Sequence, residues 1–404
     1  MTSLALSARS GFARIGCLRA GFALAGFVLV SALGVAAPPA EGEEAFNAAG
    51  EERRGEIPLG GDFQPNPQVP TFVAVGHGAR ILVSKDDGAT WTQAFFGYPG
   101  SDHGGWATNA VAYTNGVFAL PVGWTKPTSY LASEDGVRWR HLTDGTTSIE
   151  RRSDDPTLMP TAMSIAGGQG VFVFTGYMTI ARTPDLGGAW ETFALRDLKE
   201  SQLPRKLVTH HIKTTWLGEE SGRFLAIGND RSKEDPQFGN LFASDDLGKT
   251  WTWLKPEGLD DLKDYAGIVS NGKSVLLTDK AGENAYVSTD GGATWDGPHA
   301  TGAGRRPTAS VVGGEFWLSG KPSRASADGK TWRDLPGEVP SGHIAEAASG
   351  TLICVDRGRT NVLRSADGGR TWDEVHSFEP PATEHIHGGQ GLRDVVFGFT
   401  APTN

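Results

Sequence analysis

The sequence predicts an all-β fold, a seven-bladed β-propeller of four-stranded antiparallel blades that is closed by its C-terminal strand. Three observations predict it. One short motif recurs seven times, apolar segments accompany the copies in a constant order, and a lone apolar segment is left over near the C-terminus. The composition agrees, because 55 Gly and 12 Trp in 404 residues are typical of many short strands joined by tight turns.

The recurring motif reads Ser or Thr, any residue, Asp, then Gly and Trp. Its copies begin at Ser84, Ser133, Thr183, Ser244, Ser288, Ser326 and Ser365. Short Ser and Asp side chains bond nearby backbone amides, Gly permits the positive φ of a chain reversal, and Trp supplies a large ring to pack between sheets. We therefore expect these seven motif turns to be structural, since seven catalytic copies in one repeat protein are implausible.

Four apolar segments, A to D in chain order, make up a repeat, and the motif turn lies between C and D. In the fourth repeat these segments are 212–217, 223–228, 241–243 and 250–254. Four short strands at a period of roughly 40 to 50 residues describe one propeller blade. The pattern therefore predicts seven blades.

The first repeat lacks a segment A. Its expected strands B, C and D are residues 72–75, 81–84 and 90–95. The lone segment 392–399 resembles segment A of the second repeat, because residues 387–397 align with residues 103–113. We expect this C-terminal segment to complete the first blade, which closes the ring and protects its sheet edges.

The motif turns resemble the Asp-box, or bacterial neuraminidase repeat, of a broad β-propeller superfamily. The resemblance covers residues 70–399 and implies the fold. The same repeat occurs in sialidase-like, xyloglucan-hydrolase, sortilin-like and photosystem II assembly factor propellers, so it implies no single activity. Sialidases have six blades and a Phe/Tyr-Arg-Ile-Pro motif, whereas the nearest match here, residues 54–58, lacks Arg before Ile57.

The N-terminus is typical of an exported protein. Residues 1–37 read as a secretory signal peptide, with three arginines before an apolar run and small residues after it. Residues 38–69 are polar and rich in Pro and Gly, which indicates a flexible linker before the propeller at 70–399. We expect a secreted or periplasmic protein with no membrane contact after signal cleavage; a retained anchor is the alternative.

The net charge of −10 disfavours nucleic acid and anionic membranes as general partners. After signal cleavage Cys354 would be the one remaining cysteine, so no internal disulfide is expected. We expect a protein or glycan ligand and a monomer.

A binding site is expected on the face where the B–C and D–A connections emerge around the central channel, which we call the mouth face. The motif turns lie on the opposite face. The candidate ligand-binding residues on the mouth face are His77, His103, His211, Tyr265, Arg306, His343 and His387. Loops gathered on one face of a rigid scaffold are where binding usually resides.

Four of these histidines, His77, His103, His343 and His387, fall on consecutive blades. Neutral imidazoles brought together can bind a transition metal, here Zn or Cu, or act as general bases. The alternative is that each caps a strand or meets solvent singly, since no compact metal-ligand motif is present. Two functions stay open: an exported protein that binds a partner protein or glycan, or an enzyme at the same face, either sialidase-like, another glycoside hydrolase, or metal-dependent.

Overall fold

The chain divides into two compact units, Met1–Pro38 and Pro39–Asn404. The computed structural model describes residues of the second unit, namely 69–95, 108–122, 129–141, 162–176, 179–183, 191–194, 209–230, 240–259, 265–356, 360–378 and 391–400. The predicted signal peptide 1–37, and the predicted linker except Val69, lie outside the described residues.

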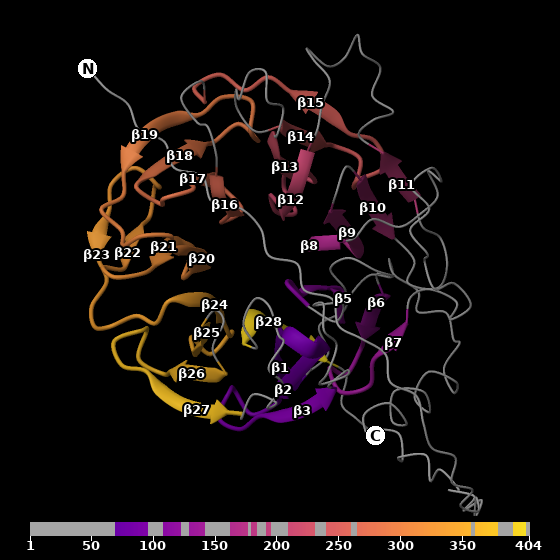
Figure 1. Ribbon diagram of the computed structural model, residues 1–404, viewed down its shortest axis with the longest axis vertical. Helices are drawn as coiled ribbons and strands as arrows, with labels where there is room; N and C mark the ends of the chain where they lie inside the picture. The colour runs from indigo at the N-terminus through magenta and orange to yellow at the C-terminus, as the bar shows by residue number, and fades with distance from the viewer. Residues whose placement is uncertain are drawn as a thin grey trace, which may run out of the picture. The chain divides into compact units, whose positions relative to one another are not determined.

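The described strands form seven four-stranded antiparallel sheets arranged as a ring, which confirms the predicted seven-bladed β-propeller (Figure 1). Blade 1 holds β28 (Leu392–Thr400), β1 (Val69–Gly76), β2 (Arg80–Ser84) and β3 (Thr92–Phe95). Blade 2 holds β4 (Ala112–Thr114), β5 (Val117–Val122), β6 (Ser129–Ser133) and β7 (Arg140–His141). Blade 3 holds β8 (Ala162–Gly168), β9 (Val171–Gly176), β10 (Thr179–Thr183) and β11 (Glu191–Ala194).

The remaining four blades follow in chain order. Blade 4 holds β12 (Thr209–Trp216), β13 (Phe224–Asp230), β14 (Asn240–Ser244) and β15 (Thr252–Leu254). Blade 5 holds β16 (Tyr265–Ser270), β17 (Val275–Asp279), β18 (Asn284–Ser288) and β19 (Asp296–Ala300). Blade 6 holds β20 (Thr308–Val312), β21 (Glu315–Ser319), β22 (Arg324–Ser326) and β23 (Arg333–Asp334). Blade 7 holds β24 (Gly342–Glu346), β25 (Leu352–Asp356), β26 (Asn361–Ser365) and β27 (Asp373–Ser377).

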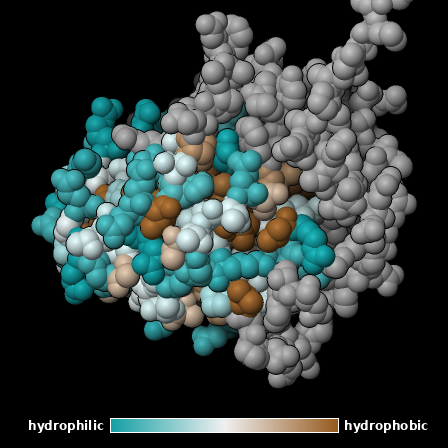
Figure 2. Space-filling view, turned by 90° about the horizontal axis from the view of Figure 1, so that it is seen from below, coloured by the Kyte–Doolittle hydropathy of each residue, from teal (hydrophilic) through white to brown (hydrophobic). Residues whose placement is uncertain are grey.

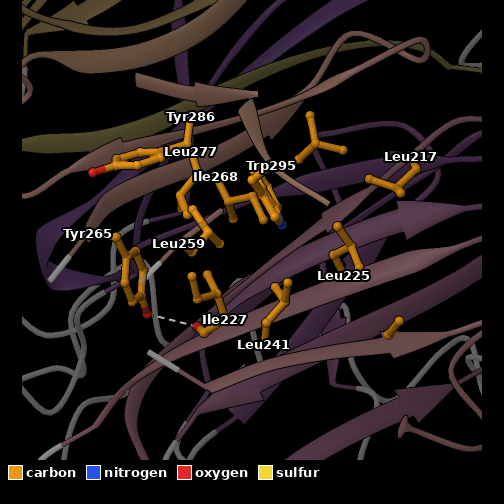
Figure 3. Packing of buried hydrophobic residues seen from close by; sticks show 12 residues of the cluster. Leu217, Leu225, Ile227, Leu241, Leu259, Tyr265, Ile268, Leu277, Tyr286 and Trp295 are labelled. Carbon is orange, nitrogen blue, oxygen red and sulfur yellow. Dashed lines mark hydrogen bonds between the residues drawn. The ribbon is translucent and has the colours of Figure 1, made fainter. Parts of the chain in front are cut away.

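The core lies between neighbouring blades, which is why the second strand of a blade is apolar on both faces. In β1, Phe72 and Ala74 pack in one cluster with residues of blade 7. Val73 and Val75 pack in another with residues of blade 2. Successive side chains of a strand point to opposite faces of its sheet. A strand whose sheet is covered by a neighbouring blade on each face therefore needs an unbroken run of apolar residues. Figure 3 shows the same packing where blade 4 meets blade 5.

The motif turns are held by a repeated set of hydrogen bonds. In blade 5, the Ser288 hydroxyl donates to Asp290 Oδ1 at 2.8 Å, and the Gly292 N–H donates to Ser288 Oγ at 2.8 Å. Asp290 Oδ1 also accepts the Thr294 N–H at 2.9 Å. The Trp295 indole N–H donates to the Gly292 carbonyl at 3.1 Å. Equivalent bonds recur in blades 1, 4 and 7, so these residues are structural, as predicted.

An arginine of one blade also binds the motif turn of the next, which the sequence did not predict. Arg182 Nε donates to the Leu247 carbonyl at 2.7 Å, and Arg364 Nε donates to the Asp87 carbonyl at 2.9 Å. Leu247 and Asp87 occupy the same motif position, with φ of 59° and 60°. These two turns, in blades 4 and 1, therefore join two blades as well as two strands.

Strand β28 closes the ring (Figure 1). It pairs with β1 along its length, from Val69 opposite Thr400 to Gly76 opposite Leu392. It is one residue longer than the expected segment, because Thr400 still pairs. The first and last described strands thus share one sheet, and β28 covers the edge of β1 that would otherwise be exposed.

The described part of the surface is largely polar. Figure 2 views the ring from its rim and shows hydrophilic residues with hydrophobic ones scattered among them. Among the described residues, the large hydrophobic side chains are buried or partly buried, with the exception of Val137, which is 41% exposed. The described residues also include no helix with the length and apolar character needed to cross a membrane.

Deleting residues 391–404 should open the ring. The deletion removes β28 and leaves β1 as an exposed edge strand, which invites aggregation and proteolysis. We expect a lower melting temperature and rapid cleavage by trypsin. Deletion of residues 401–404, which lie beyond β28, is the control. A 391–404 deletion that melts with the full chain would contradict closure by β28.

The motif turns should weaken in acid. Hydrogen bonds from the Thr371 N–H and hydroxyl and from Ser365 lower the pKa of Asp367 to about 2, and the pKa is also lowered at Asp86, Asp135, Asp246, Asp290 and Asp328. A carboxyl with a depressed folded pKa stabilises the fold above its unfolded pKa of about 4, and this stability is lost as the pH falls through the folded value. The melting temperature should therefore drop from about pH 4 to about pH 2, and less steeply for Asp367→Asn. If the melting temperatures of the unaltered protein and Asp367→Asn fall in parallel with pH, the loss of stability does not come from Asp367.

Candidate functional site at the channel mouth

His77 lies at the mouth end of blade 1. β1 ends at Gly76, and a single 3-10 turn, His77–Ala79, leads into β2. The His77 N–H donates to the carbonyl of Gly391 at 3.2 Å, immediately before the innermost strand β28. His77 therefore occupies the B–C loop beside the channel, where the sequence places it.

The His77 side chain is buried, and one of its ring nitrogens has no partner. Its exposed fraction is 8%, and Nε2 makes no hydrogen bond to the described protein. Burial lowers the pKa of His77, and the Arg393 guanidinium lowers it further. The imidazole is therefore neutral near pH 7, with one nitrogen available to donate or accept a hydrogen bond.

Two further unpaired polar atoms lie beside this loop. The Thr108 N–H donates to the Gly76 carbonyl at 3.3 Å, which brings residues 108–109 against the end of β1. Thr108 Oγ1 and Asn109 Nδ2 are buried without a hydrogen-bond partner in the described protein. Buried polar groups are nearly always satisfied by protein, water or ligand, so this polar cluster, defined by His77, Thr108 and Asn109, is a candidate site for polar groups from outside the chain.

His343 and Asp394 meet at the start of the neighbouring innermost strands. His343 Nδ1 lies 3.5 Å from Asp394 Oδ1, and the side chains are 39% and 17% exposed. Asp394 Oδ2 also accepts the Val111 N–H of blade 2 at 3.0 Å. Burial raises the pKa of Asp394, and His343 opposes that rise. One carboxyl group on blade 1 thus contacts blade 7 and blade 2.

The sequence did not single out Thr108, Asn109, Arg393 or Asp394. The charged pair Arg393–Asp394 was the available signal, because it interrupts the apolar pattern of a strand that was expected to be innermost. Thr108 and Asn109 carried no comparable signal, since polar residues before a strand are common.

Among the other predicted residues, Tyr265 is buried, with 6% exposure, and its hydroxyl donates to the Ile227 carbonyl at 2.7 Å (Figure 3). It therefore joins blades 4 and 5 and has no free face for a ligand. Arg306 is exposed on the loop before β20, with a positive φ of 52°. His211 lies on β12, but its side chain is outside the described parts. His103 and His387 lie outside the described residues altogether.

The predicted metal site involves these last two residues. Within the described ranges, His, Cys, Asp and Glu form no group of three suited to a metal ion. His77 and His343 both lie at the mouth around the start of β28, while His103 and His387 fall outside the described ranges. The shared site therefore stays a prediction.

Comparison with known proteins supports the fold. No protein-family model and no curated protein sequence matches the chain. The chain is similar to a structure of unknown function from Desulfotomaculum acetoxidans, with 10% identity over 83% of this chain and 99% of that chain and a TM-score of 0.50. It also matches YCF48 from Cyanidioschyzon merolae, with 14% identity, 73% and 96% coverage and a TM-score of 0.45. A GH74 enzyme from Niastella koreensis matches with 14% identity over 82% of this chain and 68% of that chain, with a TM-score of 0.34. The likeness at a TM-score of 0.50 supports the fold alone, because identities this low carry no information on activity.

His77 should titrate below its ordinary pKa of 6.5. Its imidazole signals in an NMR pH titration should show the lowered midpoint, because burial disfavours the charged ring. Arg393→Gln should raise the midpoint only partly, since burial is the larger cause. A midpoint at or above 6.5 would show that the ring is solvated or meets an anion.

Proposed function

We propose that this protein is an exported binding protein of the Asp-box superfamily, which holds a partner protein or glycan at its mouth face. One observation carries the proposal. His77, Thr108 and Asn109 present buried polar atoms that the described protein leaves unpaired, and an unpaired buried polar group costs about 1 to 3 kcal/mol. A ligand that supplies the missing hydrogen bonds would recover that free energy.

The surroundings of the polar cluster suit binding. Its residues are attached to the ends of β1 and β28, which pair along their whole length. A site on strand ends is positioned more rigidly than one on free loops, which reduces the entropy lost on binding. His343, which is partly exposed, adds an imidazole at the edge of the same strand end.

The test is a screen of the labelled protein on a printed glycan array and a phage-displayed peptide library. His77→Ala should weaken the selected ligand about tenfold, the effect of losing one well-made hydrogen bond. Asp290→Ala, in a motif turn on the opposite face, should lower the free energy of unfolding by about 1 kcal/mol and leave the affinity of the folded protein unchanged. If Asp290→Ala removes binding and His77→Ala does not, the ligand binds the motif-turn face and the proposal is contradicted.

An enzyme acting at the same face, either a glycoside hydrolase or a metal-dependent enzyme, is the second candidate. The contact between His343 and Asp394 favours it, because a carboxylate beside one ring nitrogen can orient an imidazole for general acid–base catalysis. Turnover of methylumbelliferyl glycosides, sialosides included, that is lost in His343→Ala would support this function. Absence of turnover across the panel would leave the binding function.

A Zn or Cu ion held by His77, His103, His343 and His387 would belong to that second function. Imidazoles bind metal in their neutral form, so metal affinity should fall as the pH drops through about 6.5. Elemental analysis should find the metal in the purified protein and lose it in the double variant His103→Ala with His387→Ala. Equal metal content in both proteins would exclude joint ligation by these residues.

A further inference from the structure

The mouth face carries a second feature on blades 5 and 6, whereas the polar cluster lies around the end of β1 in blade 1. Three loops there, residues 279–284, 301–307 and 320–323, present a group of exposed cations that we call the basic rim. Its members are Lys280, Arg305, Arg306 and Lys321. Each of these loops connects either strands B and C or one blade to the next, so all of them emerge on the mouth face.

Backbone contacts bring the three loops together. The Arg306 N–H donates to the Ala281 carbonyl at 2.8 Å, and the Gly304 N–H donates to the Pro322 carbonyl at 2.8 Å. Gly304 packs so closely on the backbone of Lys321 that a Cβ atom would not fit. The middle loop is therefore fixed to both of its neighbours, so the four cationic residues lie on adjoining loops.

The loops are also held by their own side chains. The Thr301 hydroxyl donates to the Gly282 carbonyl at 2.6 Å, and the Ser323 hydroxyl donates to the Gly320 carbonyl at 2.6 Å. Arg306 keeps a left-handed φ of 52°, which glycine would adopt without strain. A strained residue that the surrounding structure fixes is a candidate for function, and here the strained residue carries a charge.

The charge of the rim is opposite to that of the protein. The three loops hold four cations and two carboxylates, whereas the whole chain has a net charge of −10. One of those carboxylates, Asp279, already accepts the Glu283 N–H at 2.9 Å and the Asn284 side-chain amide at 2.8 Å. Glu283 is the other, and it is exposed. The rim is therefore a local positive region on an acidic protein.

We propose that the basic rim docks a short acidic segment of a partner protein. Guanidinium groups bind carboxylates in paired hydrogen bonds, and two adjacent arginines can hold two neighbouring acidic side chains. The three loops of the rim contain no aromatic ring on which a sugar or a base could stack. A long polyanion would also meet repulsion from the rest of the acidic surface, which a short segment avoids.

This proposal names the partner chemistry of the mouth face and so rests on the proposed function, although it uses different residues. The probe is a fluorescent peptide that alternates Glu and Ser, and the readout is fluorescence polarisation at low and physiological salt. Arg305→Gln with Arg306→Gln should weaken binding about tenfold, and added salt should weaken binding to the unaltered protein. Arg305→Gln with Lys321→Gln should act similarly and leaves the strained position untouched.

The matched control is Lys249→Gln with Lys273→Gln, which removes two exposed cations from the opposite face. It should bind the peptide as the unaltered protein does. Equal binding by the rim variants and this control would overturn the proposal, as would binding of a uronic-acid polymer in preference to the peptide. His77→Ala should leave binding of the Glu–Ser peptide unchanged. If His77→Ala loses the ligand selected in the glycan and peptide screen while the rim variants bind the Glu–Ser peptide normally, the proposal for the basic rim is wrong and the proposed function stands. If the rim variants lose the peptide and His77→Ala has no effect on any ligand, the basic rim is supported and the site at His77 is wrong.

Discussion

The fold depends on the pairing of β28 with β1, because this pairing turns a row of seven sheets into a ring. Each blade buries its two faces against its neighbours, so a row would end in two uncovered apolar faces. The register from Val69–Thr400 to Gly76–Leu392 removes both of those ends at once. Asp394 strengthens the junction, since it accepts the Val111 N–H and contacts His343, and so links three blades from a single strand.

The two faces of the ring use polar groups in different ways. On the motif-turn face, Ser, Asp and Trp satisfy one another and the backbone in the turns of blades 1, 4, 5 and 7, and two arginines extend that network to the next blade. In these turns the polar groups are used to stabilise the fold. On the mouth face, His77, Thr108 and Asn109 keep unpaired atoms, which is the property expected of a binding site.

Charge divides the mouth face as well. Around blade 1 a neutral imidazole, a carboxyl of raised pKa and an arginine lie close together. Around blades 5 and 6 exposed cations stand on interlocked loops. A ring of rigid blades can hold two such regions at fixed positions, because each depends only on the loops of its own blades. A partner that contacts both would gain from both without any change in the fold.

The number of blades, the order of strands and the closing strand could all be predicted from the sequence. This was possible because a repeated turn motif and short apolar segments in a constant order are local signals that reappear in every copy. Three properties became visible in the folded molecule alone: Tyr265 is a buried packing residue, Asp394 links three blades, and Thr108 and Asn109 keep unpaired atoms near the end of β1. Those properties arise where residues far apart in the chain meet, and a burial environment created by several blades leaves no local pattern in any one of them.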